Sequence, residues 1–409
     1  MRPQTVVKGT LSALRSASFF TATASTSGCE RLLPANARLK NTAHNEQSPR
    51  TTPNLAARLS LLFLLLVYLV PAQAARSCVV LQYHHVSNDT PGITSVTPAQ
   101  FNDHLDYLQT NHFNVMPLRE VVTALTKGTG LPEKCVSLTV DDAYTSVYQN
   151  AYPRIKALGW PMTVFVSTAG VDAGIASFMS WEQMREMSQH GVVFENHGHG
   201  HIHLLRTIPD ESMTAWRERI LNDIQTAQQR ITQEIGNAPR LFAHPYGEFN
   251  PEVIQLVKAS GLTGFGQQSG PLWPRADFGA LPRFPMNAQY ASMPGFIIKV
   301  NSLPLPVVSA EPGDPLVPLQ QWRPELKLTL EPGSYSKATL QCFTGGSNNV
   351  ELTWSTDRPG LLSIKPNFDL KPGRSRTNCT MPANHTGRFR WYSHNWFVRN
   401  ADGSWYQEY

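Results

Sequence analysis

Four histidines fall within seven residues of this chain, at a spacing that suits a metal centre. His197 and His201 are four residues apart, and so are His199 and His203. Such a spacing places two imidazoles on one side of a helical turn, where both can bind a divalent ion. An apolar run at 192–195 leads into the cluster, which favours a built site over a surface histidine tract that binds metal loosely. Both pairs stay open as ligands.

Two adjacent carboxylates, Asp141 and Asp142, follow a second apolar run at 136–140. Both cannot point into a core, because an unpaired buried charge is costly. One aspartate and two histidines would form a three-ligand site with a position left for water, and the second aspartate could act as general base. The alternative is that Asp142 caps a helix beginning near Tyr144.

A third cluster, His244-Pro245-Tyr246-Gly247, follows the apolar residues 241–243. A turn at this point could aim a backbone N–H or the Tyr246 hydroxyl into a pocket. By itself the cluster is an ordinary turn, and it gains meaning only beside the other two.

The elements that must position these clusters alternate between short apolar runs and helical periodicity from residue 78 to about 300. Repeated strand–helix units predict an α/β fold with a parallel sheet, open or closed into a barrel, and ligands bind beyond the carboxyl ends of its strands. The expected strands are 78–83, 136–140, 162–166, 192–195, 241–243 and 296–300, and the expected helices begin at 98 and cover 118–125, 144–158, 181–189, 213–235 and 251–260.

The last hundred residues have a different pattern. Residues 303–324 are rich in proline and are expected to form a linker. Residues 325–409 lack helical periodicity, and short strands are expected at 326–330, 337–342, 350–355 and 389–397. This region therefore predicts a small all-β domain of sandwich type.

Residues 1–74 are expected to be a leader rather than a domain. An apolar stretch at 59–70 follows Arg58 and precedes an Ala-x-Ala site that ends at Ala74. This is the pattern of a cleaved signal peptide, and the stretch is shorter than the roughly 20 apolar residues of a membrane span. We expect an exported protein, periplasmic or extracellular, with no stable membrane span after cleavage. An uncleaved anchor is the alternative.

The charge balance depends on this leader. The 409 residues contain 35 basic and 30 acidic side chains, a net charge of +5. Eight basic and two acidic residues fall in 1–74, which leaves 27 and 28, a net charge of −1. The basic excess therefore gives no support to a nucleic-acid partner. With 41% hydrophobic and 16% charged residues, the chain is globular rather than disordered.

Four cysteines remain beyond the leader, and an even number in an exported chain permits disulfides. Cys78 and Cys135 each begin an expected strand, so they could lie on neighbouring parallel strands. Cys342 and Cys379 both lie in the C-terminal region. We expect the pairs Cys78–Cys135 and Cys342–Cys379.

Taken together, the clusters resemble the motifs of polysaccharide deacetylases, carbohydrate esterase family 4. The resemblance covers about 78–302, the expected catalytic domain, and implies a distorted (β/α) barrel that removes acetyl groups from glycans. It rests on Thr139-Val140-Asp141-Asp142, on Asn196-His197-x-x-x-His201-x-x-Leu204, on Pro245-Tyr246-Gly247 and on the opening strand Tyr83-His84-His85-Val86.

The resemblance also implies roles for individual residues. Asp141 would be the general base, and the Tyr246 backbone N–H would help to form the oxyanion hole. Asp142, His197 and His201 would bind a divalent metal, for which Zn²⁺ fits best and Co²⁺, Ni²⁺ or Mn²⁺ are possible. The expected substrate-binding residues are Pro245, Gly247 and His85.

Three departures from the family pattern matter. Gly198 stands where members usually have Ser or Thr, and His244 precedes the Pro-Tyr pair where an Arg is common. The late Leu-x-His motif, which often supplies the general acid, has no clear counterpart. His84 or His85 could take that role, or the attacking water could return the proton, and Arg283 could orient Asp141.

The first strand resembles that of deacetylases acting on poly-N-acetylglucosamine, so an acetylated polysaccharide is the expected partner; the sequence does not indicate an oligomeric state. Two other functions stay open. One is a non-catalytic glycan-binding protein whose β domain stacks sugars on tryptophans. The other is a metal-dependent amidase acting on peptides. The candidate tryptophans, which could equally form the domain core, are Trp354, Trp391, Trp396 and Trp405.

Overall fold

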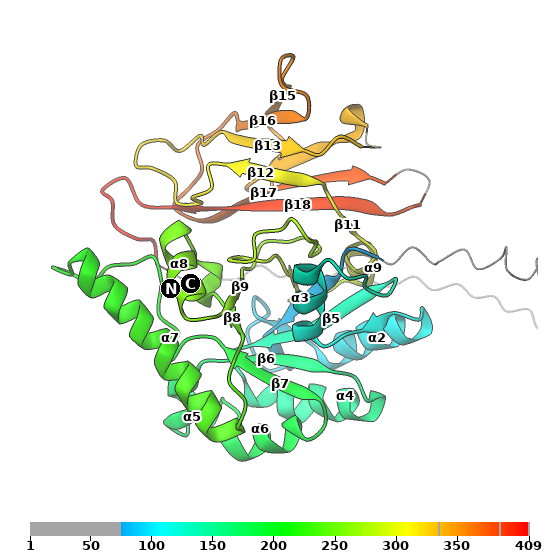
Figure 1. Ribbon diagram of the computed structural model, residues 1–409, viewed down its shortest axis with the longest axis vertical. Helices are drawn as coiled ribbons and strands as arrows, with labels where there is room; N and C mark the ends of the chain where they lie inside the picture. Colours follow the sequence, from blue (N-terminus) through cyan, green and yellow to red (C-terminus); the bar gives the residue numbers. More distant parts are fainter. Residues whose placement is uncertain (1–74, 334–335, 384–385, 408–409) are drawn as a thin grey trace, which may run out of the picture. The chain divides into compact units, whose positions relative to one another are not determined.

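A curved parallel sheet of eight strands forms the centre of the region that precedes residue 286 (Figure 1). The computed structural model describes residues 75–409 except 334–335, 384–385 and 408–409, so the expected signal segment lies outside the described residues. The strand order is β10-β1-β5-β6-β7-β8-β9, with β4 paired to β5. The strands are β1 (Val79–Tyr83), β4 (Asn114–Val115), β5 (Cys135–Asp141), β6 (Met162–Val166), β7 (Val192–Asn196), β8 (Leu241–Ala243), β9 (Thr263–Phe265) and β10 (Phe284–Pro285).

The two ends of this sheet approach each other through one segment. Leu281 forms a parallel bridge with Phe265 of β9, and three residues later Phe284 pairs with Leu81 of β1. The same segment thus touches both edges, and the sheet curls toward closure. This confirms the expected distorted (β/α) barrel.

Helices lie on the outside of the sheet (Figure 1), and several of them begin at capping residues. Thr97 and Ser180 each form a capping box with a glutamine three residues later, and Ser212 caps the longest helix. The helices are α2 (Pro98–Thr110), α3 (Leu118–Lys127), α4 (Tyr152–Leu158), α5 (Thr168–Asp172), α6 (Trp181–Ser188), α7 (Met213–Ile235), α8 (Pro251–Ala259) and α9 (Met293–Val300). A short parallel pair, β2 (His85–Val86) and β3 (Ser95–Val96), precedes α2.

Two expected elements of the barrel region differ from the structure, and in the C-terminal region the expected strand 337–342 is a 3₁₀ turn at Lys337–Thr339 followed by a strand at Gln341–Thr344. Residues 296–300, expected as a strand, belong to helix α9, where Phe296, Lys299 and Val300 are buried at helical spacing. Its apolar run resembles a buried strand, and only the preceding Ser292 and an early proline indicate a helix. The expected helix 144–158 begins instead as a π-helical turn, Val147–Ala151, before α4.

Both expected disulfides are present. Cys135 begins β5 and is bonded to Cys78, which immediately precedes the neighbouring strand β1. Cys342 and Cys379 are bonded between directly paired positions of two antiparallel strands.

Two four-stranded sheets make up the C-terminal region and pack face to face as a sandwich (Figure 1). The expected linker 303–324 contributes strands to both sheets, so residues 303–311 are part of the sandwich and not a connection to it. Its prolines allow this because the strands concerned lie at sheet edges. One sheet has the order β11 (Leu303–Pro304), β18 (Phe389–Val398), β17 (Gly373–Pro382) and β14 (Gln341–Thr344), and the other has β12 (Val307–Glu311), β13 (Leu326–Leu330), β16 (Leu361–Pro366) and β15 (Val350–Trp354).

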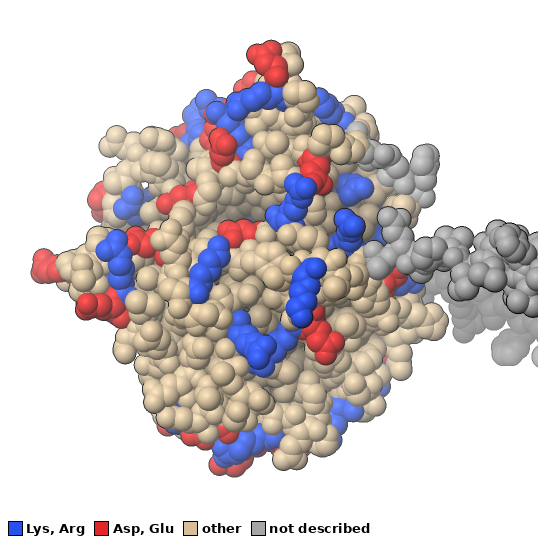
Figure 2. All heavy atoms as spheres, in the orientation of Figure 1, with Lys and Arg blue, Asp and Glu red and all other residues tan. Residues whose placement is uncertain are grey.

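Acidic and basic side chains alternate over the face of the molecule shown in Figure 2. This distribution agrees with the near-neutral balance of the region after residue 74. No helix among the described residues is long and apolar enough to cross a membrane.

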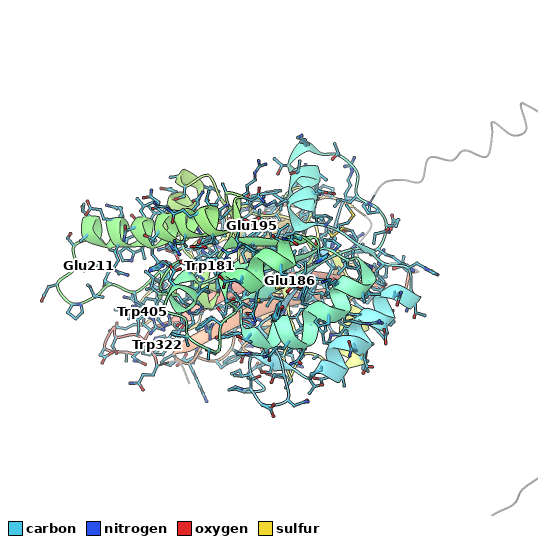
Figure 3. All side chains as sticks on the ribbon, turned by 90° about the horizontal axis from the view of Figure 1, so that it is seen from below. Trp181, Glu186, Glu195, Glu211, Trp322 and Trp405 are labelled. Carbon is cyan, nitrogen blue, oxygen red and sulfur yellow. A yellow bond between two sulfur atoms is a disulfide. The ribbon has the colours of Figure 1, made fainter. Side chains whose placement is uncertain are left out.

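Glu195 lies in the interior of the molecule, on β7, behind the helix that carries Trp181 and Glu186 (Figure 3). Its carboxylate accepts hydrogen bonds from the backbone N–H groups of Arg240 and Leu241 and pairs with Arg119. The buried charge is thereby satisfied, and it ties β7 to the beginning of β8. Glu195 therefore supports the sheet rather than the histidine cluster that follows it.

Candidate metal centre

The two aspartates lie where β5 ends and the chain turns sharply. Asp142 and Ala143 both have positive φ, 69° and 61°, a conformation that costs a non-glycine residue energy. The residue that precedes the first helical turn is Ser146, so the alternative reading of Asp142 as a helix cap is wrong. The turn instead directs Asp142 toward the histidines.

Asp142, His197 and His201 come together at one point. Their ligand atoms all lie within 4.8 Å of one another. The Asp142 Oδ1 atom is 3.2 Å from His197 Nε2 and 3.3 Å from His201 Nε2. Asp142 Oδ1 and His197 Nε2 are buried and have no hydrogen-bond partner within the described part of the chain. Because buried polar atoms are normally satisfied, these orphaned atoms fit a missing divalent cation.

The tautomer of His197 also fits metal binding. Its Nδ1 atom donates a hydrogen bond of 2.7 Å to the Ala243 carbonyl oxygen at the end of β8. The proton is thereby held on Nδ1, which leaves a lone pair on Nε2 facing Asp142. A hydrogen bond from the ring nitrogen that does not face the metal is typical of metal-binding histidines.

The other histidine pair is directed elsewhere. His199 Nδ1 lies 2.8 Å from the Thr168 hydroxyl, and His203 Nδ1 lies 3.1 Å from a carboxylate oxygen of the buried Glu248. His199 and His203 therefore do not join Asp142, and the structure selects between the two pairs that the sequence left open.

Helix α7 supplies a residue that holds the histidine loop. Asp223 accepts hydrogen bonds from the backbone N–H groups of His199 and Gly200, at 3.0 and 2.7 Å. A Cβ atom on Gly198 would lie 2.5 Å from Asp223 Oδ2, and the φ of Gly198 is +78°. A side chain at position 198 would therefore require Asp223 to shift and would be strained by the positive φ. No local motif marks Asp223, which is one of three acidic residues on this amphipathic helix.

Asp141 is fully buried and held by three hydrogen bonds. Arg283 donates to both carboxylate oxygens, at 2.6 and 2.8 Å, and Gln82 Nε2 donates to Oδ2 at 2.6 Å. Burial alone would raise the pKa of Asp141, but the Arg283 guanidinium outweighs it, and the pKa is lowered. The residue stays ionised near neutral pH. Gln82 was missed in the sequence, although a glutamine inside an apolar strand was a signal.

His84 lies beside Asp141, with Nε2 3.9 Å from Asp141 Oδ2. Burial lowers the pKa of the His84 imidazole. His85 points away from this pair: its Nδ1 contacts the Ser146 hydroxyl at 3.1 Å, and its ring stacks on Tyr144 at 3.7 Å. Of the two candidate general acids, only His84 is near the base.

The turn Pro245–Gly247 lies next to His201. Tyr246 has φ +58°, and its ring lies 4.5 Å from that of His201 and stacks on His203 at 3.8 Å. The Tyr246 carbonyl oxygen accepts a hydrogen bond of 2.7 Å from Arg374 of β17. A strand of the β sandwich thus contacts the turn next to the ligands.

Glu248, which follows this turn, is another point of contact with the C-terminal region. Its carboxylate is fully buried and accepts a hydrogen bond of 3.4 Å from the Tyr406 hydroxyl. His203 Nδ1 contacts the same carboxylate oxygen. His244, which precedes Pro245, is buried as well and bonds the Gly279 carbonyl oxygen at 2.8 Å. Arg283, and not His244, therefore orients the Asp141 carboxylate.

Sequence comparisons identify the family of the central region. Residues 128–265 match the sequence model of the polysaccharide deacetylase family. The Bacillus subtilis protein YxkH, whose name assigns it to the polysaccharide deacetylases, is 28% identical over 182 residues, 44% of this chain and 61% of that protein. A poly-β-1,6-N-acetyl-D-glucosamine N-deacetylase of Staphylococcus aureus is 27% identical over 196 residues, 46% of this chain and 67% of that protein.

The fold agrees with this assignment. The Streptococcus pyogenes deacetylase PplD, solved with acetate, superposes with a TM-score of 0.50 at 22% identity, over 55% of this chain and 98% of that one. Less than two thirds of the length of the Bacillus relative is matched by the chain. Residues 128–265 are therefore a polysaccharide deacetylase domain by their sequence match, and the barrel fold of this region agrees with that match.

Proposed function

We propose that this protein is a metal-dependent hydrolase that removes acetyl groups from an N-acetylglucosamine polysaccharide. The observation that carries the proposal is the convergence of Asp142, His197 and His201 next to Asp141, a separate buried carboxylate with its own arginine. Two carboxylates with different partners suit two roles, ligand and base. A glycan-binding protein with an inactive barrel would not need this arrangement.

Asp142, His197 and His201 would hold the ion, with Zn²⁺ the best fit to one carboxylate and two imidazoles. A divalent cation at this point would polarise the acetyl carbonyl and make water more acidic. Co²⁺, Ni²⁺ and Mn²⁺ accept the same donors, so repletion with each metal identifies the most active form.

The side chains around this point supply the proton transfers. Asp141 is ionised and takes a proton from the attacking water, while Arg283 and Gln82 fix the orientation of its carboxylate. His84 lies beside Asp141, and because burial lowers its pKa it would first receive the proton that Asp141 takes from water and then pass that proton to the leaving sugar nitrogen. The backbone N–H of Tyr246 stabilises the tetrahedral oxyanion; one such donor contributes roughly 100–1,000-fold in rate.

The choice of substrate rests on the Staphylococcus relative, whose name specifies poly-β-1,6-N-acetyl-D-glucosamine. His85, Pro245 and Gly247, on either side of the ligands, are the proposed substrate-binding residues. An exported location, in the periplasm or outside the cell, fits the two disulfides, since such bonds persist in oxidising compartments.

Acetate release from poly-β-1,6-N-acetylglucosamine, measured before and after chelation, tests the proposal. We expect release that stops with chelator and returns with added metal. Acetylated peptides and other acetylated glycans serve as parallel substrates. Metal-dependent release from peptides alone would replace this function by an amidase, and the absence of release from every substrate would refute a catalytic role.

Two variants test the residue roles. Asp141→Asn should retain stoichiometric metal and lose acetate release, because the ligand atoms are untouched and the base is gone. His201→Ala should lose metal, measured by elemental analysis. An active Asp141→Asn protein would remove Asp141 from the role of base, and retained metal in His201→Ala would return the ligand assignment to the other histidine pair.

A further inference from the structure

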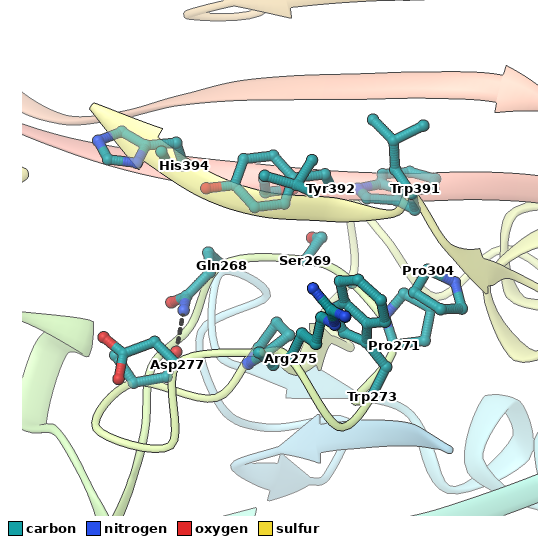
Figure 4. Close-up of a pocket in the computed structure, with 18 of the residues that line it drawn as sticks. Gln268, Ser269, Pro271, Trp273, Arg275, Asp277, Pro304, Trp391, Tyr392 and His394 are labelled. Atoms are coloured by element: carbon teal, nitrogen blue, oxygen red, sulfur yellow. Dashed lines mark hydrogen bonds between the residues drawn. The ribbon is translucent and has the colours of Figure 1, made fainter. Parts of the chain in front are cut away.

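A cavity of about 370 Å³ lies between the barrel and the β sandwich, apart from the metal ligands. Figure 4 shows its two walls: Trp391, Tyr392 and His394 of β18 face the segment that carries Gln268 and Trp273. This volume lies within the range of about 300–1,000 Å³ for small-molecule sites. The cavity is therefore large enough for a ligand, and its lining indicates the class.

Aromatic side chains form part of both walls. Trp273 comes from the barrel side, and Trp391 and Tyr392 come from β18. Trp391 is fixed by an edge-to-face contact with Phe284 and by a hydrogen bond from its indole N–H to the Ser393 hydroxyl. Flat apolar faces with fixed positions suit the C–H faces of a sugar ring.

The buried polar groups of the lining are all neutral at neutral pH. They comprise two amides, two hydroxyls and one imidazole whose pKa is lowered to about 4 by burial. These side chains, each at most 9% exposed, are Gln268, Ser269, Ser393, His394 and Asn395. A site of this kind favours a neutral ligand with hydroxyl and amide groups, because a buried ion would lack a partner.

The charged side chains of the lining are exposed and already paired. Arg275 is 2.9 Å from Glu331, and Asp277 is 3.7 Å from Lys258. They do not offer an unmatched charge to an ionic ligand. This favours an uncharged sugar over a phosphate or an amine.

One polar atom in the cavity is unsatisfied. The Nε2 atom of His394 is buried and has no hydrogen-bond partner in the described part of the chain. A buried imidazole nitrogen normally has one, and its absence here indicates a group that a ligand or water would satisfy. His394 is in the cavity lining but its Nε2 atom is itself buried, so a sugar hydroxyl or amide bound in the cavity would contact that atom once the imidazole turns toward it.

We propose that this cavity binds a neutral N-acetylated sugar unit, at a site distinct from the metal centre. The choice of N-acetylglucosamine as the sugar rests on the proposed function, whereas the neutral saccharide class rests on the cavity itself. Pro282 lines the cavity, and the adjacent Arg283 holds Asp141, so the two sites share a segment of backbone. Under the proposed function, a polymer bound in the cavity would be held on the protein that also removes its acetyl groups.

Isothermal titration of the full chain, carrying Asp141→Asn to prevent turnover, tests the proposal with N-acetylglucosamine and with its β-1,6-linked pentamer. We expect Trp273→Ala to weaken one binding event about tenfold, which corresponds to ~1.4 kcal/mol, as loss of an aromatic anchor typically does. Trp160→Ala, which removes a partly buried tryptophan of the barrel outside the cavity, is the matched control. His394→Phe removes the unsatisfied nitrogen, keeps a ring, and should weaken the same event.

Monomer and pentamer separate two sources of the sugar: binding of the monomer indicates a site for free sugar, and binding of the pentamer alone indicates a polymer site. Unchanged titrations for both Trp273→Ala and His394→Phe would overturn the proposal. Acetate release by the parent protein is measured in parallel. Release without cavity binding refutes only this inference, and cavity binding without release refutes only the catalytic function.

Discussion

Replacing Arg283 with methionine tests the balance of forces around Asp141. The variant loses two charge-assisted hydrogen bonds, at 2.6 and 2.8 Å, and leaves a fully buried carboxylate with Gln82 as its hydrogen-bond donor and the His84 imidazole 3.9 Å away. Bonds to charged groups contribute about 1.5–3 kcal/mol each, and breaking a buried ion pair costs about 3–5 kcal/mol. We therefore expect a loss of about 3–5 kcal/mol in the free energy of unfolding.

The loss should depend on pH with a definite sign. In the parent, the pKa of Asp141 is lowered, so its contribution is present above the unfolded pKa of about 3.9 and is lost as pH falls through the folded value. Without Arg283, burial raises the pKa of Asp141 above the unfolded value. The penalty of Arg283→Met is then largest near neutral pH and shrinks as acid protonates the carboxyl group.

Urea unfolding in the presence of a chelator, at several pH values, measures both effects. Asp141→Asn together with Arg283→Met should recover part of the stability, because the isolated charge is gone. Arg323→Met is the matched control, since that exposed arginine pairs with Asp369 at 2.6 Å and exposed pairs contribute about 0–1 kcal/mol. A penalty of Arg283→Met that equals the control, or that is independent of pH, would refute the reasoning.

The remaining predictions concern the loops around the ligands. Gly198→Ser should reduce metal affinity by titration, since its Cβ meets Asp223 at 2.5 Å, and Asp223→Ala combined with it should recover part of that affinity. Ala143→Gly should stabilise the protein by about 0.5–1 kcal/mol in thermal unfolding, because the φ of 61° suits glycine; no change or a loss would argue against strain there. If His84 donates the proton, the basic limb of the kcat–pH profile should vanish in His84→Gln; an unchanged limb would assign the acid elsewhere.

Local patterns predicted the main part of the metal site. Asp142, His197 and His201 follow expected strands, and the carboxyl ends of parallel strands meet at one edge of a sheet, so their convergence followed from the topology. The choice between histidine pairs did not follow. It depends on Thr168 and Glu248, which hold the other pair and lie on distant segments.

The supporting residues were harder to predict for the same reason. Asp223 and Gln82 act through contacts over 23 and 59 positions of the chain, and neither belongs to a local motif.

Prediction of the fold was limited in a similar way. The apolar run at 296–300 is as compatible with a helix as with a strand. The proline-rich segment 303–311 shows no clear alternation of apolar and polar residues that would indicate edge strands.

The contacts of Arg374 and Tyr406 with the 245–248 loop affect how this protein can be divided. A chain cut after α9 would keep the eight parallel strands and the three ligands, yet would lose the donor to the Tyr246 carbonyl oxygen and a partner of buried Glu248. Exchange of the C-terminal region for that of a related protein would thus remove contacts that support the 245–248 loop. The support of the 245–248 loop therefore extends along the chain to residue 406, and gene fusions should treat the sandwich as part of that support rather than as a separable domain.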